Sequence, residues 1–261
     1  MGSSMPARHR RAAHYKEDQV MAKNCFSVHL GLLAYGEAWE LQKRLVAARK
    51  ADTIEDVLLF CEHPHVITLG RNGKRQNLLA SEHVLRQKGV EFHATNRGGD
   101  ITYHGPGQLV GYPILNLGAI RRDVVWYVRT LEEAMIRTSA EFGIAASRAP
   151  GKTGIWVRPG NTEEKLGAIG VHISRWVTSH GFAYNVSTDL RFFDLIVPCG
   201  IADRKATSLE KLLGRSVEIK EVIPRIARHL GELFGLEQKG ISKEELLQKL
   251  EHAEQGVPVS A

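Results

Sequence analysis

The sequence predicts an α+β fold built on a mixed sheet flanked by helices. Strand and helix patterns follow one another without the strict alternation that a parallel β-α-β sheet requires. The composition, 43% hydrophobic and 25% charged over 261 residues, is that of a globular protein that can bury a sizeable core. Because no apolar run reaches the roughly 18–20 residues of a membrane span, we expect no membrane association.

Helices are predicted where apolar residues recur at helical spacing. Ala38, Leu41 and Leu45 show this spacing most clearly. Ser81 and Asp123 stand directly before two further helical patterns and are the expected N-caps. The predicted helices are 35–49, 81–88, 123–142, 206–213, 217–233 and 242–252.

Strands are predicted where short apolar or alternating runs lie between turn residues. The glycine-rich stretch 97–107 is expected to be loop in large part, and 235–240 is expected to be a linker. The predicted strands are 25–33, 56–61, 66–69, 90–95, 109–117, 153–157, 166–173 and 180–186.

The formal charge of +6 does not indicate a nucleic-acid-binding protein. The first 24 residues carry five basic residues against two acidic ones, a net of +3, so the remaining body is only mildly basic. Its basic residues are interspersed with acidic ones rather than gathered into a footprint for nucleic acid. We expect residues 1–23 to form a flexible basic tail, with a tag remnant or a targeting segment as alternatives.

The three cysteines, Cys25, Cys61 and Cys199, cannot all pair with one another. None belongs to a C-x-x-C pair, so neither a disulfide framework nor a zinc site is predicted. Cys25 and Cys61 lie within apolar strand runs and are expected to be structural. This cysteine usage favours a reducing, cytoplasmic location.

The segment from Arg97 to Gln108 holds four glycines within eleven residues. Glycines let a substrate lie against bare backbone, and His104 adds a side chain that ordinarily titrates near neutral pH. The spacing matches neither a P-loop nor a dinucleotide-binding fingerprint. A long turn between two strands is the alternative, but the polar groups at Asp100, Tyr103 and His104 favour a functional loop.

Lys165 stands at the mouth of the predicted strand 166–173. Gly167, Ala168 and Gly170 could leave room beside it for a slender ligand, although a lysine at a strand end is usually only solvated. Cys199 lies between Pro198 and Gly200, which would present its sulfur on a tight bend. A lone cysteine is more often structural, but a nearby cation would lower its pKa and make it a nucleophile.

Taken together, several motifs resemble the lipoyl(octanoyl) transferase family. The resemblance spans roughly residues 24–236, and the tail and the last helix lie outside it. It implies a catalytic domain over 24–236 like that of biotin and lipoate protein ligases. Residues 1–23 are expected to be a tail, and residues 237–261 a C-terminal helical extension. The matching motifs are 97–108, 165–170, 180–185 and 198–201, with shorter matches at 62–64, 68–71 and 207–209.

The resemblance implies transfer of an octanoyl group from octanoyl-acyl carrier protein to a lysine of a lipoyl domain. The acceptors would be the lipoyl domains of 2-oxoacid dehydrogenase complexes and the glycine cleavage H protein. An acyl-enzyme thioester would form on Cys199, and Lys165 would lower that thiol's pKa and shuttle protons. No cofactor, metal or nucleic acid is implied, and a monomer is expected. The implied substrate-binding residues are Arg97, Gly98, Gly99, Asp100, Ile101, Thr102, Tyr103, His104, Ala168, Ile169, Gly170, Gly181, Phe182 and Ala183.

Lys165 and Cys199 are 34 residues apart, so only the fold can bring them together. Their contact is the central hypothesis drawn from the sequence. The main rival is an ATP-dependent lipoate or biotin ligase on the same fold, which would need no nucleophilic cysteine. Two further rivals are an inactive relative that only binds its protein partners and a thioesterase that passes the acyl group to water. We expect His104→Ala to slow transfer while the protein still folds.

Overall fold

The computed structural model describes residues 23–197 and 205–256. The predicted tail up to residue 22 and the motif at 198–201, with Cys199, lie outside the described residues. The helices are α1 (Tyr35–Lys50), α2 (Glu82–Gln87), α3 (Leu117–Ile120), α4 (Val124–Glu141), α5 (Leu209–Leu213), α6 (Ile219–Phe234) and α7 (Lys243–Glu254), with 3-10 turns η1 (Arg75–Asn77) and η2 (Leu190–Leu195).

Twelve strands are described. They are β1 (Lys23–Leu32), β2 (Asp56–Glu62), β3 (Val66–Leu69), β4 (Glu91–Ala94), β5 (Ile101–His104), β6 (Gln108–Ile114), β7 (Ser147–Ala149), β8 (Lys152–Val157), β9 (Glu164–Ser174), β10 (Val177–Asn185), β11 (Lys205–Ala206) and β12 (Leu236–Gly240).

Nine of these strands form one mixed sheet, which confirms the predicted fold class. Their order is β12-β1-β2-β6-β10-β9-β8-β7, and β11 pairs with β9 outside this path. β1 is parallel to both β12 and β2. Along the rest of the sheet, β2-β6-β10-β9-β8-β7, each strand is antiparallel to the next. The central β6 is buried along its whole length.

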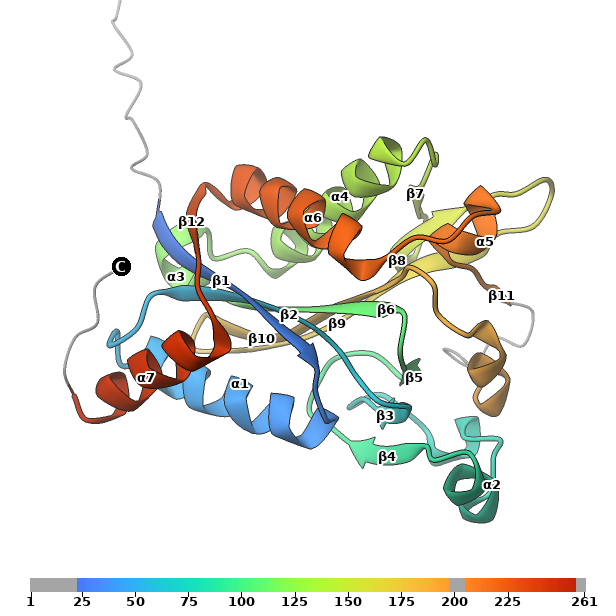
Figure 1. The fold of residues 1–261 in the computed structure, drawn as a ribbon, viewed down its shortest axis with the longest axis horizontal. Coiled ribbons are helices and arrows are strands. Elements are labelled where there is room, and N and C mark those ends of the chain that lie inside the picture. Colours follow the sequence, from blue (N-terminus) through green and yellow to red (C-terminus); the bar gives the residue numbers. More distant parts are fainter. Residues whose placement is uncertain (1–22, 198–204, 257–261) are drawn as a thin grey trace, which may run out of the picture.

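Helices cover both faces of this sheet (Figure 1). α4 and α6 pack on one face, over a core that includes Met135, Phe182 and Tyr184. α1 and α7 cover the other face, over a second core that includes Leu45 and Leu250. A smaller sheet of order β4-β3-β5 lies beside α2 and closes one end of the α1 side.

The glycine-rich stretch 97–107 is loop in large part, as predicted, but it also contains β5, because Ile101–His104 pairs antiparallel with β3. The linker prediction is wrong. The expected linker 235–240 is largely β12, which extends the large sheet by pairing in parallel with β1. The sequence of β12 does not alternate between apolar and polar residues, and its partner β1 is more than 200 residues earlier in the chain. The strand predicted over 109–117 ends at Ile114, and α3 begins at Leu117.

Most other predicted elements are confirmed. Ser81 caps α2 by accepting a hydrogen bond from the Val84 amide, and Asp123 caps α4 through the Trp126 amide. The expected domain boundary between residues 236 and 237 falls within β12 and stays a prediction. Every helix among the described residues is too short or too polar to span a bilayer.

Candidate active site

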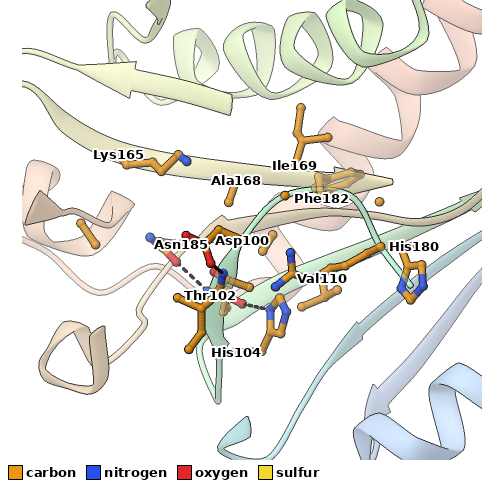
Figure 2. A pocket seen from close by; sticks show the side chains of 18 of the residues that line it. Asp100, Thr102, His104, Val110, Lys165, Ala168, Ile169, His180, Phe182 and Asn185 are labelled. Carbon is orange, nitrogen blue, oxygen red and sulfur yellow. Dashed lines mark hydrogen bonds between the residues drawn. The ribbon is translucent and has the colours of Figure 1, made fainter. Parts of the chain in front are cut away.

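A cavity opens where β5, β6, β9 and β10 meet. It encloses about 1000 Å³ not occupied by any atom, a volume that includes its open mouth. Lys165 and all of the predicted substrate-binding residues except Gly98 and Tyr103 line it. Segments predicted separately from the sequence are therefore brought together by the fold (Figure 2).

Lys165 lies near the start of β9, half-buried at one end of the row of lining side chains (Figure 2). Its ammonium nitrogen is 4.9 Å from the centroid of the Trp156 ring, and its carbonyl accepts a hydrogen bond from the Thr207 amide. The predicted contact between Lys165 and Cys199 stays a prediction, because Cys199 lies outside the described residues.

The small residues of β9 have different neighbours, and not all of them line the cavity. Gly167 does not line the cavity, contrary to expectation, because it faces the α4 layer. A Cβ atom there would lie 2.8 Å from the Met135 sulfur. At Gly170 a Cβ would come within 2.8 Å of the Gly98 carbonyl oxygen, so this glycine lets the loop after β4 dock on the strand. Ala168 faces the cavity, as expected.

Arg97 is buried and holds that loop against β3. Its guanidinium donates to the Thr68 side-chain oxygen at 2.9 and 3.1 Å and to the Thr68 carbonyl at 2.7 Å. The neighbouring Gly98 amide donates to the Val171 carbonyl at 2.8 Å. Gly98 therefore fastens the loop to β9 rather than lining the cavity.

His104 is buried, so the expectation that it titrates near neutrality is wrong. Burial, with the nearby positive charge of Arg97 and the His63 ring adding to it, lowers the pKa of His104 to about 3. Its Nδ1 donates to the Gln108 side-chain oxygen at 2.7 Å, and Gln108 in turn donates to the Asn185 side-chain oxygen at 2.9 Å. The ring is therefore neutral and held in one tautomer.

Tyr103 points away from the cavity because side chains alternate along β5. Its hydroxyl lies 2.7 Å from the His65 Nδ1, and its ring stacks on Phe192 of η2. Tyr103 therefore ties β5 to the segment that leads towards residue 198. Tyr103 therefore supports the strand that lines the cavity and does not line the cavity itself.

His180 lines the cavity and was not predicted as a site residue. Phe182 and Tyr184 on the same strand face the α4 layer, and simple alternation would place His180 with them. Its φ of 55° turns the side chain to the opposite face instead, where it donates to the Asn96 side-chain oxygen at 2.7 Å and packs near Trp39. Burial, together with Arg97, lowers the pKa of His180 to about 3.

His180 and Lys165 lie at opposite ends of the cavity (Figure 2). His180 pairs with Val171, six positions along β9 from Lys165. At roughly 3.3 Å per residue this separates the two levels by about 20 Å along the strand. The cavity is thus an elongated slot along β9 and β10 rather than a round pocket.

Other lining residues also escaped the sequence reasoning. Gln108 and Asn185 belong to quoted motifs but were assigned no role, whereas Tyr35, Tyr112 and Trp156 lie in ordinary helix and strand patterns. The spacing of a single element gives no signal for these three, since their place depends on which strands pair.

Cys25 and Cys61 are buried free thiols, and burial raises the pKa of both. The expectation that they are structural fits these surroundings. Among the residues that the structure describes, no group of histidine, cysteine and carboxylate side chains could hold a metal ion.

Comparisons with known proteins identify the family. The sequence model for the Lipoyl protein ligase A/B catalytic domain matches residues 34–231. The chain is 54% identical to the Octanoyltransferase of Acidobacterium capsulatum, over 80% of this chain and 89% of that protein. It is also 54% identical to the Octanoyltransferase of Solibacter usitatus, over 82% and 95%.

Solved structures show the same fold at low identity. A bipartite lipoate protein ligase from Thermoplasma acidophilum superposes with a TM-score of 0.66 at 17% identity, covering 90% of this chain and 93% of that one. Lipoate-protein ligase A bound with ATP gives 0.62 at 15%, covering 90% and 95%. With a family match over residues 34–231 and relatives at 54% identity, the chain belongs to the Lipoyl protein ligase A/B catalytic domain family, among its octanoyltransferases.

Proposed function

We propose that this protein transfers an octanoyl group from octanoyl-acyl carrier protein to a lysine of a lipoyl domain, through a thioester on Cys199. The observation that carries the proposal is the elongated cavity with Lys165 at one end. Its walls include small apolar side chains at Val110, Ala168 and Ala183, which suit an unbranched hydrocarbon chain. Each buried methylene would contribute about 0.8 kcal/mol of binding.

The chemistry proceeds in two balanced steps. The Cys199 thiolate attacks the thioester carbonyl of the donor, and the charged Lys165 donates the proton with which the carrier's thiol leaves, so that Lys165 is neutral for the next step. The acceptor lysine amine then attacks the enzyme thioester, an amide bond forms, and Cys199 leaves as thiolate. The amine must lose a proton in this step, and Lys165 is the group that accepts it.

We place this activity in the cytoplasm of the cell and assign it to the monomer. The free thiols at Cys25 and Cys61 suit a reducing compartment. The acceptors in this proposal are the lipoyl domains of 2-oxoacid dehydrogenase complexes and the glycine cleavage H protein. No step of the route calls for a metal, a nucleotide or a prosthetic group.

Intact-mass spectrometry tests the covalent step. The protein is mixed with octanoyl-acyl carrier protein without acceptor or ATP, and one added octanoyl group is expected. Hydroxylamine at mildly alkaline pH should release it, because thioesters are labile to this reagent. Cys199→Ser should carry no adduct or a hydroxylamine-resistant one, and Cys61→Ser serves as the matched control that keeps the labile adduct.

Different outcomes would assign a different function. Acyl transfer that appears only with ATP and free octanoate would indicate a ligase. Octanoate release without acceptor would indicate a thioesterase. No adduct and no transfer under any of these conditions would indicate a protein that only binds its partners.

A further inference from the structure

Trp156 on β8 is paired with Lys165 on the neighbouring strand β9. β8 runs antiparallel to β9, and Trp156 pairs with Lys165 just after a register shift between Ile155 and Trp156. The indole is only 1% exposed, lines the cavity, and has the Lys165 ammonium nitrogen 4.9 Å from its ring centroid. This distance is within the range of a cation–π contact.

The backbone of β8 is shaped to let the Lys165 side chain reach this ring. Gly154 has a φ of 103°, and a Cβ atom there would lie 3.1 Å from the Lys165 Cε and 2.4 Å from the Gly167 carbonyl oxygen. The Gly154 amide donates to a side-chain oxygen of the buried Glu132 at 3.0 Å. Glu132 therefore anchors the glycine over which the lysine side chain lies.

We propose that Trp156 is the positioning residue for Lys165, whose ammonium it holds at the cavity's end and stabilises relative to the neutral amine. The negative face of the indole attracts the charged form and not the uncharged one. The inference deepens the proposed function and rests on it for the role of Lys165. It makes the ring the group that sets how readily Lys165 releases and recovers a proton.

Most of the charged side chains around Lys165 form ion pairs with one another. Lys152 lies 5.1 Å from the centroid of the same indole but forms an ion pair with Glu163. Glu164 is paired with Lys211 at 3.0 Å. From α4, Glu132 is paired with Arg129 and Arg148. Lys205 on β11 pairs in register with Glu164, next to Lys165, and adds a like charge.

Fluorinated tryptophan at position 156 tests this contact without altering the packing. Fluorine withdraws charge from the ring face while leaving the indole nearly the same size. Lysine labelled with ¹³C at Cε reports the titration of Lys165 by NMR, and Lys165→Arg assigns its signal. Tetrafluorotryptophan at 156 should lower the titration midpoint of Lys165 by about one pKa unit, a tenfold change in proton affinity, and difluorotryptophan by less.

Trp39 provides the matched control, since Lys43 lies 5.3 Å from its ring centroid on α1. Tetrafluorotryptophan at position 39 should leave the Lys165 midpoint unchanged. A midpoint that stays constant or rises across the series at 156 overturns the inference.

The NMR titration does not depend on activity. A graded fall of the midpoint in a protein that forms no acyl-enzyme would support the positioning role and refute the proposed function. In an active protein, the pH profile of octanoyl transfer should move by the same amount and in the same direction as the midpoint. A profile that moves in the opposite direction would refute the inferred link to proton release.

Discussion

His104 takes part in a chain of hydrogen bonds that fixes which of its ring nitrogens carries the proton. Gln108 donates to the Tyr103 carbonyl and to Asn185, so its side-chain oxygen is left to accept from the His104 Nδ1. The Asn185 amide then donates to the Thr207 carbonyl at 2.9 Å. The chain links β5, β6 and β10 to the segment after β11, so His104 has a positioning role.

Replacing His104 by glutamine should slow octanoyl transfer about tenfold, the cost of roughly one misplaced hydrogen bond. The shape of the pH profile between pH 6 and 8 should not change, because the pKa of His104 lies at about 3. Steady-state rates across this range measure both effects. Loss of one limb of the profile in the variant would instead mean that His104 titrates there during transfer.

At this scale the sequence predicted the residue types well but not the direction in which each side chain points. The row 97–104 was expected to line a site as a whole. Strand pairing divides it, so that Thr102 and His104 face the cavity while Tyr103 packs against η2. His180 departs from the alternation through a positive φ that no sequence pattern predicts.

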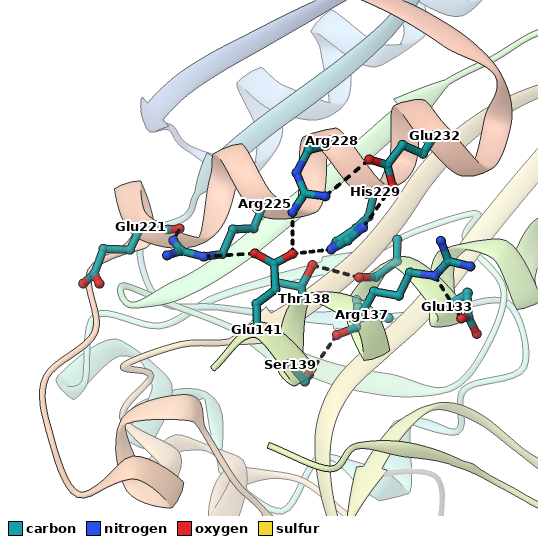
Figure 3. Close-up of polar contacts among 12 residues, drawn as sticks. Glu133, Arg137, Thr138, Ser139, Glu141, Glu221, Arg225, Arg228, His229 and Glu232 are labelled. Carbon is teal, nitrogen blue, oxygen red and sulfur yellow. Dashed lines mark hydrogen bonds and ion pairs between the residues drawn. The ribbon is translucent and has the colours of Figure 1, made fainter. Parts of the chain in front are cut away.

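Among the elements, α4 and α6 are joined by a cluster of charged side chains around Glu141 (Figure 3). Glu141 accepts from Arg228 and His229 at 2.5 Å each and lies 3.4 Å from Arg225. Burial alone would raise the pKa of Glu141, but the hydrogen bonds from His229 and Arg228 outweigh it and lower the pKa. The cluster holds the end of α4 on α6.

Glu141→Gln should lower the melting temperature by about 2–4 °C, because it removes a charge shared by three partners. Glu232→Gln is the control. Glu232 lies at the edge of the cluster, is half exposed, and has a side-chain oxygen 3.3 Å from the guanidinium of the same Arg228. It should change the melting temperature by less than about 1 °C. Equal effects of the two substitutions in calorimetry would contradict a specific role for Glu141.

β12 and α7 show where element prediction from sequence fails. The helix pattern over 242–252 predicted α7 to within a few residues, but 236–240 gave no strand signal. β12 is defined by its pairing with β1, which is more than 200 residues earlier in the chain. α7 then packs on the α1 side, with Leu246 and Leu250 fully buried in the same core as Leu45.

A chain that ends at residue 235 should therefore lose much of its stability. Burial of a leucine contributes about 1.5–3 kcal/mol, so loss of β12, Leu246 and Leu250 should lower the melting temperature by at least about 10 °C. A chain that ends at residue 256 keeps both elements and serves as the control. Equal melting temperatures would mean that the segment after 236 is an independent extension.

For the whole molecule, three buried histidines with lowered pKa values, His63, His104 and His180, couple folding to pH. Burial lowers the pKa of His63 to about 4 and, together with nearby charges, that of His104 and His180 to about 3. Above the ordinary value of about 6.5 these groups are neutral whether the chain is folded or not. Below it the unfolded chain binds protons that the folded protein does not, so stability is lost as the pH falls from about 6.5 towards 3–4.

The free energy of unfolding should drop by several kcal/mol between pH 7 and pH 5, with about 2 kcal/mol from each histidine at pH 5. Urea titrations at half-unit steps of pH measure this slope. His83→Gln, at an exposed position on α2, should leave the slope unchanged. Stability that stays flat from pH 7 to pH 5 would show that the three rings accept protons in the folded state.

At this scale the sequence predicted the fold class and the convergence of distant motifs, because motif order and strand content carry that information. It did not predict the two-sheet arrangement, in which β3, β4 and β5 form a separate sheet and β5 lines part of the cavity. That arrangement depends on pairings between strands that are short and only partly apolar. It also creates the slot into which the side chain of His180 turns.

The burial of Cys25 and Cys61 gives the folded protein a built-in selectivity towards thiol reagents. Both sulfurs lie inside the two cores and have raised pKa values, so a maleimide or iodoacetamide should reach neither in the native state. Of the three cysteines in the chain, at most one, Cys199, is then available for labelling. A single fluorophore or cross-linker could thus be attached at the proposed nucleophile without removing any other cysteine, and a second label per chain would report partial unfolding.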